Sequence, residues 1–331
     1  MVSTGAIIPE ERLDSNDSIN LSSAHLRPWA GLPRDAKKPS TQPFSIGGGG
    51  IRQGGLYTRG FAKKSQPDRP LITVITVVLN GVCFLENCIN SVLSQTYENI
   101  EFIVLDGGST DGTVDIIKKY DDRIDYWVSG KDGGIYEAMT RGTEIANGDW
   151  IYFLGCDDIL IESIAAMAVF LRDKMAIYYG DVFLPHQNKK YDGVFTARKL
   201  LLNNISHQSM FFPRSLFCKY SFDLKYRTHA DHELNMRLFC HSPYSFVYAP
   251  VLVAVFNDCN GVSSLAEDPV LLANRHRLIK AYFPRHLYVY FLIRCSSVRC
   301  MEILGLKKTF KLLLKRRAKS RVVPYPSSEG D

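Results

Sequence analysis

The sequence has 331 residues, of which 46% are hydrophobic and 22% charged, so it is long enough for one large or two modest globular domains. This composition excludes collagen, a coiled coil and a wholly disordered chain. The formal net charge of +6 divides into +4 for residues 1–69, −9 for residues 70–269 and +11 for residues 270–331. Because the middle is acidic and the last part strongly basic, we expect these two regions to contact different partners.

The N-terminal region carries no predicted targeting segment. Its first residues lack the basic stretch and apolar run of a secretory signal, and no apolar run in the chain approaches the roughly 18 residues needed to cross a bilayer. Residues 1–69 are rich in Ser, Pro, Gly and Asn, and we expect a mostly disordered arm in which 51–69 lie on the domain that follows. The expected location is the cytoplasm.

Alternating strand and helix patterns begin at Pro70. Continuous β-branched and apolar runs predict strands, each of the first three followed by a helical pattern, at residues 71–79, 101–105, 125–128 and 150–154. Strand and helix alternating through short connections indicate right-handed βαβ units. The expected fold is therefore α/β, Rossmann-like, with a mostly parallel sheet and helices on both faces. After residue 160 the pattern becomes mixed, with a helix expected at 159–173 and a strand at 176–184.

Three polar clusters share one place in this predicted sheet. Asn80, Asp106 and the pair Asp157–Asp158 each follow a strand directly. Ligands of open α/β sheets bind outside the carboxyl ends of the strands, so we expect a cleft there. Asp106 is placed to point its carboxylate into that cleft and accept a hydrogen bond from a base. No G-x-G-x-x-G follows the first strand, which disfavours an NAD-dependent enzyme.

The adjacent carboxylates Asp157 and Asp158 predict a cation site. Two negative charges in a partly buried cleft cost free energy unless a cation or hydrogen-bond donors compensate, and hard oxygen ligands suit Mg²⁺ or Mn²⁺. The structural alternative is that Asp158 caps a helix starting near Ile159.

Several of these segments occur in the order seen in a known family. PLITVITVVLN, ENIEFIVLDGGSTDGT, SGKDGGIYEAMTRG, GDWIYFLGCDD and THADHELNMRL resemble family 2 glycosyltransferases, inverting enzymes of the GT-A fold, and most of all the bacterial members that build surface polysaccharides. The resemblance covers residues 70–240. It implies a GT-A domain, which we expect at 70–265. The basic helical pattern that follows predicts a C-terminal extension at 266–331.

The resemblance also implies roles for individual residues. Asp231 matches the catalytic base, with Mn²⁺ or Mg²⁺ held by Asp157 and Asp158. The residues matching the nucleotide-sugar site are Thr76, Val77, Asp106, Asp132, Gly134, Asp157 and His207. Two of these keep a structural alternative, because Asp231 is also placed to cap a helix and His207 lies beside an apolar run typical of a core.

Two positions depart from the family pattern. Gly155 stands where the family more often has Asp or Asn in its D-x-D motif, so one contact to ribose or metal is missing. Thr140 stands where many relatives have Asn, which leaves the expected helix intact but changes a donor contact. Neither departure removes Asp157 or Asp231.

The resemblance implies a hexosyltransferase-type reaction. A sugar would pass from a nucleotide-sugar, expected to be a UDP-sugar, to a hydroxyl of a lipid-linked saccharide in surface polysaccharide synthesis. Two alternatives stay open: a sugar-phosphate nucleotidyltransferase, and a non-catalytic subunit that binds nucleotide-sugar. The first usually carries a basic Gly-rich loop after the first strand, which is absent at Asn80–Phe84.

The basic C-terminal part predicts contact with an anionic membrane. Phe310, Leu313 and Leu314 share one helical face while lysine and arginine occupy the rest, as in helices that lie at a membrane surface. We expect peripheral docking on the cytoplasmic face of the inner membrane, which would bring the cleft to a lipid-linked acceptor. The alternative is a solvated helix. No nucleic-acid-binding module accompanies the charge, so nucleic acid is not an expected partner.

Overall fold

The structure, a computed structural model, describes residues 51–191, 193–259 and 268–303, and side chains as far as residue 297. The expectations for residues 1–50 and for the amphipathic segment around Phe310 lie outside the described residues.

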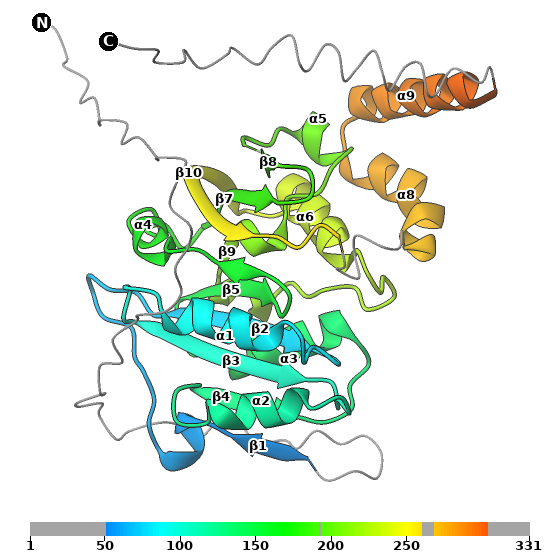
Figure 1. Cartoon of the computed structure of the whole chain (residues 1–331). Coiled ribbons are helices and arrows are strands. Elements are labelled where there is room, and N and C mark those ends of the chain that lie inside the picture. Colours follow the sequence, from blue (N-terminus) through cyan, green and yellow to red (C-terminus); the bar gives the residue numbers. More distant parts are fainter. Residues whose placement is uncertain (1–50, 192, 260–267, 304–331) are drawn as a thin grey trace, which may run out of the picture. The chain divides into compact units, whose positions relative to one another are not determined.

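A ten-stranded mixed sheet organises the fold (Figure 1). The strands are β1 (Arg52–Gly54), β2 (Ile72–Val78), β3 (Ile100–Asp106), β4 (Tyr126–Ser129), β5 (Trp150–Gly155), β6 (Ile159–Leu160), β7 (Ala176–Leu184), β8 (Lys189–Tyr191), β9 (Met210–Pro213) and β10 (Ser245–Val255). Their order across the sheet is β1-β4-β3-β2-β5-β9-β7-β10-β6, with β8 paired to β7. Strands β4, β3, β2 and β5 run parallel, so their carboxyl ends meet at one edge.

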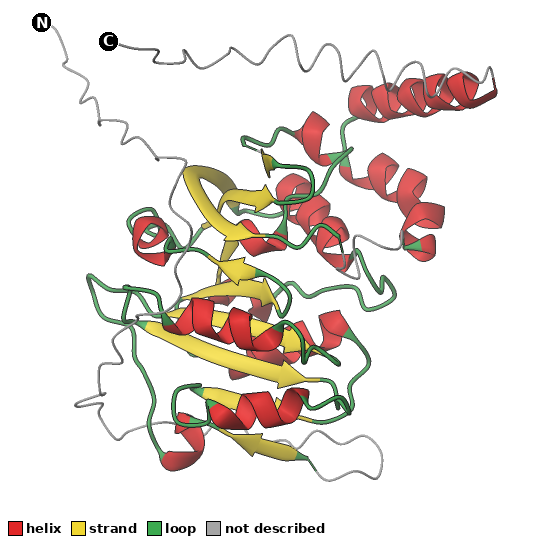
Figure 2. Ribbon diagram, viewed as in Figure 1, coloured by secondary structure: helices red, strands yellow, loops and turns green. Residues whose placement is uncertain are grey.

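Helices cover both faces of this sheet (Figure 2). They are α1 (Leu85–Leu93), α2 (Thr113–Lys119), α3 (Ile135–Ile145), α4 (Ile164–Ala168), α5 (Ala197–Leu200), α6 (Ala230–His241), α8 (Pro269–Tyr282) and α9 (Arg285–Ile303). The short 3₁₀ helices are η1 (Leu56–Arg59), η2 (His207–Ser209) and η3 (Arg214–Cys218). The mostly parallel core with helices on both faces confirms the predicted α/β fold.

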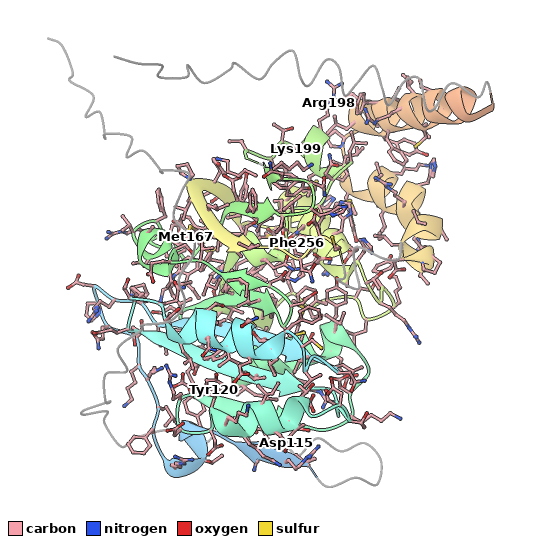
Figure 3. The ribbon with its side chains drawn as sticks, viewed as in Figure 1. Asp115, Tyr120, Met167, Arg198, Lys199 and Phe256 are labelled. Atoms are coloured by element: carbon pink, nitrogen blue, oxygen red, sulfur yellow. The ribbon has the colours of Figure 1, made fainter. Side chains whose placement is uncertain are left out.

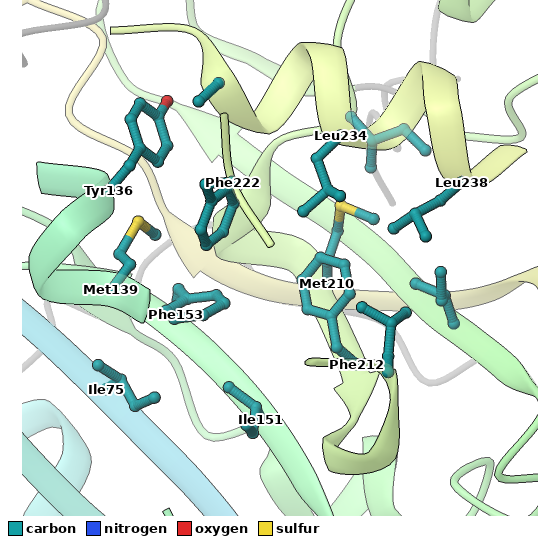
Figure 4. Close-up of a cluster of buried hydrophobic side chains, with 14 of the residues drawn as sticks. Ile75, Tyr136, Met139, Ile151, Phe153, Met210, Phe212, Phe222, Leu234 and Leu238 are labelled. Atoms are coloured by element: carbon teal, nitrogen blue, oxygen red, sulfur yellow. The ribbon is translucent and has the colours of Figure 1, made fainter. Parts of the chain in front are cut away.

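Two hydrophobic clusters lie on opposite faces of the sheet, because successive strand residues point to opposite sides. On β2, Val74 packs with α1, α2 and α4, whereas Ile75 packs with α3 and α6. Figure 4 shows part of the cluster that contains Ile75, in which Met139 of α3 and Leu234 of α6 approach the strand residues. Figure 3 shows Met167 of α4, which is fully buried in the cluster that contains Val74.

The four predicted βαβ strands are confirmed, the third displaced by one residue to Tyr126–Ser129. The helix predicted at 159–173 is wrong. Residues Ile159–Leu160 form β6 and pair with Ala254 and Val255 of β10, leaving α4 only five residues long. Almost a hundred residues separate these pairing partners in sequence, so no local pattern reveals the short strand.

Residues 51–69 form the outer edge of the sheet. Strand β1 pairs antiparallel with β4, and the Lys63 ammonium makes a buried ion pair of 2.9 Å with Asp125. The Tyr57 hydroxyl donates to Glu101, whose carboxylate also accepts hydrogen bonds from Thr73. This segment therefore contributes both a strand and buried polar contacts to the sheet.

Helix α3 lies very close to the sheet at Gly142. A Cβ atom there would come within 2.7 Å of Ile75 Cγ2 and 3.2 Å of Leu105 Cδ1, so glycine permits this approach. Thr140, which departs from the family pattern, donates its hydroxyl to the Tyr136 carbonyl at 2.7 Å. Helix α3 continues without a break past Thr140, and its first turn lies at the edge where the parallel strands end.

The last described elements are α8 and α9. Asp268 caps α8 by accepting hydrogen bonds from the Val270 and Leu271 amides. Helix α9 is anchored by Phe291, which is 3% exposed, while Val289 and Ile293 are exposed. In the part of the chain that the structure describes, none of the helices is both long and apolar enough to span a membrane.

Candidate functional site

A cavity of about 590 Å³ lies where the parallel strands end. Its walls come from the end of β2 with the loop that follows, the loop before α3 with the first turns of that helix, and the end of β5. The opposite side is built by η2, the loop before α6, and Phe256, which is labelled in Figure 3. This is the position at which the sequence predicts a ligand cleft.

Five of the predicted site residues line this cavity, and they come from separate segments of the chain. They are Val77, Asp132, Gly134, Asp157 and His207. Gly134 precedes α3 with φ of 119°, a conformation that favours glycine, and its amide donates to Asp132 Oδ1 at 2.9 Å. The fold therefore joins residues that lie up to 130 positions apart in the sequence.

Thr76 does not line the cavity. It follows Ile75 and precedes Val77 on β2, both of which do line it, so its side chain points to the other face of the sheet. There it is completely buried, with its hydroxyl 3.8 Å from the Cys88 sulfur. The prediction that Thr76 walls the nucleotide pocket is wrong for this geometric reason.

Asp106 does not line the cavity either. It is 1% exposed, and its carboxylate accepts hydrogen bonds from the Gly108 amide, from the amide and hydroxyl of Ser109, and from the Ser129 hydroxyl at 2.7 Å. The carboxylate is thus buried and engaged by these donors, and its contact with a nucleotide base stays a prediction. Asp132, whose carboxylate lies beside Gly107 in the turn after Asp106, does line the cavity.

The two adjacent carboxylates after β5 occupy different environments. Asp157 lines the cavity and accepts a hydrogen bond of 3.3 Å from the Asn257 side chain. Asp158 is 1% exposed behind it and accepts hydrogen bonds of 2.8 Å from Gln208 Nε2 and the Asn257 amide. Because β6 follows instead of a helix, Asp158 is not a helix cap. Of the two, only Asp157 presents its carboxylate to the cavity.

The electrostatics of this pair favour a bound cation. Burial raises the pKa of Asp157, and burial together with the charge of Asp157 raises the pKa of Asp158 to about 6. A divalent cation at Asp157 would offset this repulsion, and a carboxylate oxygen is a suitable hard ligand. Among the described residues no group of three or more His, Cys, Asp or Glu side chains is arranged to hold a metal, so water and a bound phosphate would complete the coordination.

Gly155 is closely packed against the same carboxylates. A Cβ atom at this position would lie 2.4 Å from Asp158 Oδ2 and 3.1 Å from Asp157 Oδ1. A larger residue here, such as the Asp or Asn expected from the D-x-D pattern, would have to displace both side chains. Glycine is therefore part of the arrangement that places Asp157 in the cavity.

Asp231 lies in the first turn of α6 and is 8% exposed. Its carboxylate accepts hydrogen bonds from Tyr136 Oη at 2.8 Å and Asn204 Nδ2 at 2.7 Å, and His207 Nδ1 lies 3.2 Å away. Burial acts to raise the pKa of Asp231, but the hydrogen bond and charge of His207, with the Tyr136 hydroxyl, lower it to about 2. The described hydrogen-bond partners are side chains from outside α6, which is not the arrangement of a helix cap.

Asp231 itself does not line the cavity, whereas Tyr136 and His207 both do. Figure 4 shows the Tyr136 hydroxyl pointing away from the strands. The carboxylate thus connects two side chains that face the cavity. Together these groups form a polar cluster of Tyr136, Asn204, His207 and Asp231 on the wall built by α3, η2 and α6.

Sequence reasoning missed four polar residues that organise the site: Tyr136, Asn204, Gln208 and Asn257. Each makes its key contact with a residue at least 27 positions away. Tyr136 and Gln208 lie within segments that the sequence analysis singled out, so their proximity to named site residues was a usable signal. Asn257 follows β10, and no local pattern connects it with Asp157.

Comparisons with known proteins show which family the chain resembles. Residues 73–219 match the family model described as Glycosyl transferase family 2. The chain is 34% identical over 212 residues to a "PGL/p-HBAD biosynthesis glycosyltransferase" of Mycobacterium bovis, covering 61% of this chain and 83% of that protein. It is 29% identical over 225 residues to an uncharacterized glycosyltransferase of Mycobacterium tuberculosis, covering 63% and 83% of the two chains.

A solved structure supports the fold. The chain is similar to residues 1–349 of S. aureus TarS, crystallised in complex with UDP-GlcNAc, with a TM-score of 0.53 and 17% sequence identity. The similarity covers 64% of this chain and 66% of that one. The fold, the position of the cavity and the relatives lead to one conclusion: this chain belongs to glycosyl transferase family 2 and is a glycosyltransferase with a GT-A fold.

Proposed function

We propose that the protein transfers a sugar, with inversion, from a UDP-sugar to a hydroxyl of a lipid-linked saccharide in the synthesis of a surface polysaccharide. One observation carries the proposal above all: a single cavity joins Asp157 after β5 with the cluster around Asp231. A cation-binding carboxylate and acid–base groups lining one cavity are what an inverting transfer from a nucleoside diphosphate requires.

The donor would lie along the edge where β2 and β5 end. Val77 and the loop at Asp132 and Gly134 line this part of the cavity and would contact the nucleotide and its sugar. Asp157 would hold Mn²⁺ or Mg²⁺, which neutralises the charge that develops on a leaving diphosphate. Asn257 would help to hold Asp157 in this position, because its backbone amide donates to Asp158 and its side chain donates to Asp157.

The acceptor would approach from the wall formed by η2 and α6. Its hydroxyl attacks the anomeric carbon opposite the nucleotide while the cluster around Asp231 receives the proton. Exposed apolar side chains also line the cavity, among them Leu79, Phe84 and Leu224. Such residues suit a ligand with an apolar part, which supports a lipid-borne acceptor.

Release of UDP from a panel of UDP-sugars tests this function. We expect the purified full-length protein to release UDP from one donor in the presence of Mn²⁺, faster when a matching acceptor is added, and not in EDTA. Formation of pyrophosphate from UTP and a sugar 1-phosphate would indicate a nucleotidyltransferase instead. Binding of UDP-sugar without turnover under every acceptor condition would support a non-catalytic subunit.

We further propose that the protein docks on the cytoplasmic face of the inner membrane through its basic C-terminal extension. Residues 270–331 carry net +11, and the exposed Val289 and Ile293 of α9 lie one helical turn apart. Each lysine or arginine near an anionic leaflet contributes about 1 kcal/mol to binding.

Liposome flotation tests the membrane proposal. We expect the full chain to float with vesicles containing anionic lipid, and a chain ending at Leu306 to bind much less. Vesicles of zwitterionic lipid serve as the control, since they remove the electrostatic attraction but keep the bilayer. Equal flotation of both chains with anionic vesicles would contradict the proposal.

A further inference from the structure

The carboxylate of Asp231 is held at both of its oxygens, and the inference drawn from this rests on the proposed function. Asn204 Nδ2 donates to Oδ2 at 2.7 Å, and Tyr136 Oη donates to Oδ1 at 2.8 Å. Asn204 is itself oriented, because its side-chain oxygen accepts a hydrogen bond of 2.9 Å from Asn235 Nδ2. Residues from α3 and from the loop after α5 therefore fix the carboxylate from two sides.

The two oxygens of this carboxylate differ in the number of groups that they meet. Each oxygen of an ionised carboxylate offers about two lone-pair sites. Oδ2 meets two nitrogens, Asn204 Nδ2 and His207 Nδ1, the second at 3.2 Å. Among the described residues, Tyr136 is the one donor to Oδ1. Oδ1 therefore keeps a lone-pair site that can take up a proton.

Tyr136 acts as a hydrogen-bond donor in this cluster. Its hydroxyl has one hydrogen and two acceptors within reach, Asp231 Oδ1 at 2.8 Å and the Thr228 carbonyl at 3.0 Å. The charged carboxylate is the stronger acceptor and also the nearer one. Burial and the charge of Asp231 raise the pKa of Tyr136 well above its ordinary value, so the phenol keeps its hydrogen.

The ring of Tyr136 is fixed by the fold and also lines the cavity. Tyr136 is 5% exposed, lies in the first turn of α3 and packs against Phe222, with the ring centroids 5.1 Å apart (Figure 4). The side chain of Asp231 is 11% exposed. Oδ1 is thus bonded to a cavity-lining residue and still has an open lone-pair site, so an acceptor hydroxyl would meet the carboxylate beside the Tyr136 hydroxyl.

We propose that Tyr136 is a positioning residue, whose hydroxyl orients the base Asp231 so that Oδ1 takes the acceptor proton. The acceptor O–H bond breaks as its oxygen forms a bond to the anomeric carbon, and the bond from that carbon to the diphosphate oxygen breaks. The diphosphate leaves with the electron pair. The proton forms a carboxylic acid at Oδ1 and passes to solvent after the products leave.

Removal of the Tyr136 hydroxyl would have two opposite effects on the base. Burial acts to raise the pKa of Asp231, and the interactions with His207 and the Tyr136 hydroxyl lower it to about 2. Without the hydroxyl this pKa rises, which by itself makes the carboxylate a stronger base. The carboxylate would also lose its contact at Oδ1 and could turn about the oxygen that Asn204 holds. A fall in turnover would therefore report lost orientation and not lost basicity.

The test measures turnover, donor affinity and melting temperature in Tyr136→Phe, which removes only the hydroxyl. We expect kcat to fall about 10- to 100-fold, as for loss of one hydrogen bond to a charged group, with the Kd for UDP-sugar unchanged within about twofold. Tyr282→Phe is the matched control, because the Tyr282 hydroxyl donates to Glu233 of the same helix at 2.6 Å and neither residue belongs to the described cavity lining. This control should keep wild-type kcat.

A rescue variant separates the hydrogen bond of Tyr136 from the packing of its ring. Replacement of Tyr136 by p-aminophenylalanine keeps the ring and places an N–H₂ group where the hydroxyl was. We expect this variant to return kcat to within about threefold of the wild type, because a donor to Asp231 is restored. Tyr136→Phe has the same ring without a donor and should stay slow.

The possible results have distinct meanings. Near wild-type kcat in Tyr136→Phe, or an equal fall in Tyr282→Phe, would overturn the inference while leaving the proposed function intact. A raised Kd for UDP-sugar with unchanged kcat would assign Tyr136 to donor binding and would also overturn it. So would a p-aminophenylalanine variant as slow as Tyr136→Phe, since ring packing would then explain the loss. Absence of any transfer by the wild type would count against the proposed function itself.

Discussion

Replacing Asp231 by asparagine is expected to lower kcat by about 10²–10⁴-fold at neutral pH while leaving the Kd for UDP-sugar nearly unchanged. The variant keeps the size of the side chain but removes its charge. Asn204 and His207 both direct N–H groups at the carboxylate. An asparagine would place its own N–H₂ group against one of these donors, and that hydrogen bond would be lost. The cluster would lose the carboxylate that can take up the acceptor proton, and His207 would lose its charged partner.

The measurement is transfer kinetics together with donor affinity by calorimetry. Asp223→Asn is a matched control, because Asp223 lies in the loop before α6 and pairs only with the exposed Lys225 among the described side chains. We expect this control to retain wild-type turnover. If Asp231→Asn kept more than about a tenth of the wild-type kcat, the cluster would have no essential part in proton transfer.

Stability must be checked in the same variant, because Asp231 also contributes to folding. Its folded pKa of about 2 lies below the value of about 3.9 for an unfolded aspartate, so its contribution is fully present above pH 4 and is lost as the pH falls through 2. The variant lacks this contribution at neutral pH, at a cost of up to about 2 kcal/mol. Kinetic assays well below the melting temperature of the variant separate this loss from the loss of chemistry.

The parallel half of the fold was predictable because its signals are local. A strand buried on both faces reads as a continuous apolar run, and each helix that follows repeats at three and four residues. Asp132 and His207 were assigned through the family resemblance. The carboxyl ends of such strands meet at one edge, so a ligand cleft with Asp157 at the end of β5 was expected there. That argument needs only the order of the elements.

The face and the partners of each side chain were not predictable in the same way. A run such as that of β2 is apolar at nearly every position, so it does not reveal that Thr76 points away from Val77 and the cavity. The carboxylate of Asp106 is engaged by its own turn and also by Ser129, which lies 23 residues further along the chain and could not be linked to it from the sequence. Contacts of this kind depend on the folded arrangement, and no repeating pattern in the sequence reveals them.

The second large effect is expected for Asp157→Ala, which should abolish metal-dependent transfer. Loss of a group that only supports a metal ligand typically costs 10- to 100-fold in metal affinity, so loss of the ligand itself should cost about 100-fold or more. We expect wild-type protein to bind UDP more tightly as Mn²⁺ is added, and Asp157→Ala to bind it weakly with little response to the metal. Calorimetry with and without Mn²⁺ measures both quantities.

The melting temperature gives an independent test of the reason for this effect. Asp158 has a folded pKa of about 6, above that of an unfolded aspartate, so its contribution to stability decreases as the pH rises from about 4 to 6 and stays unfavourable above that. Removing Asp157 takes away a charge that raises this pKa. Metal-free Asp157→Ala is therefore expected to melt no lower than metal-free wild type at pH 7, whereas Mn²⁺ should raise the melting temperature of the wild type alone.

Asp157→Asn is the control for packing, because its amide preserves the size of the side chain. If a cation offsets the repulsion between the two carboxylates, both variants lose the Mn²⁺-dependent rise in melting temperature. A rise of the same size in either variant would place the cation elsewhere. The carboxylate pair would then be a structural feature held by Gln208 and Asn257. Other groups of the cavity would have to neutralise the charge of the leaving diphosphate. Among the described residues that line the cavity, Arg227 is the one lysine or arginine.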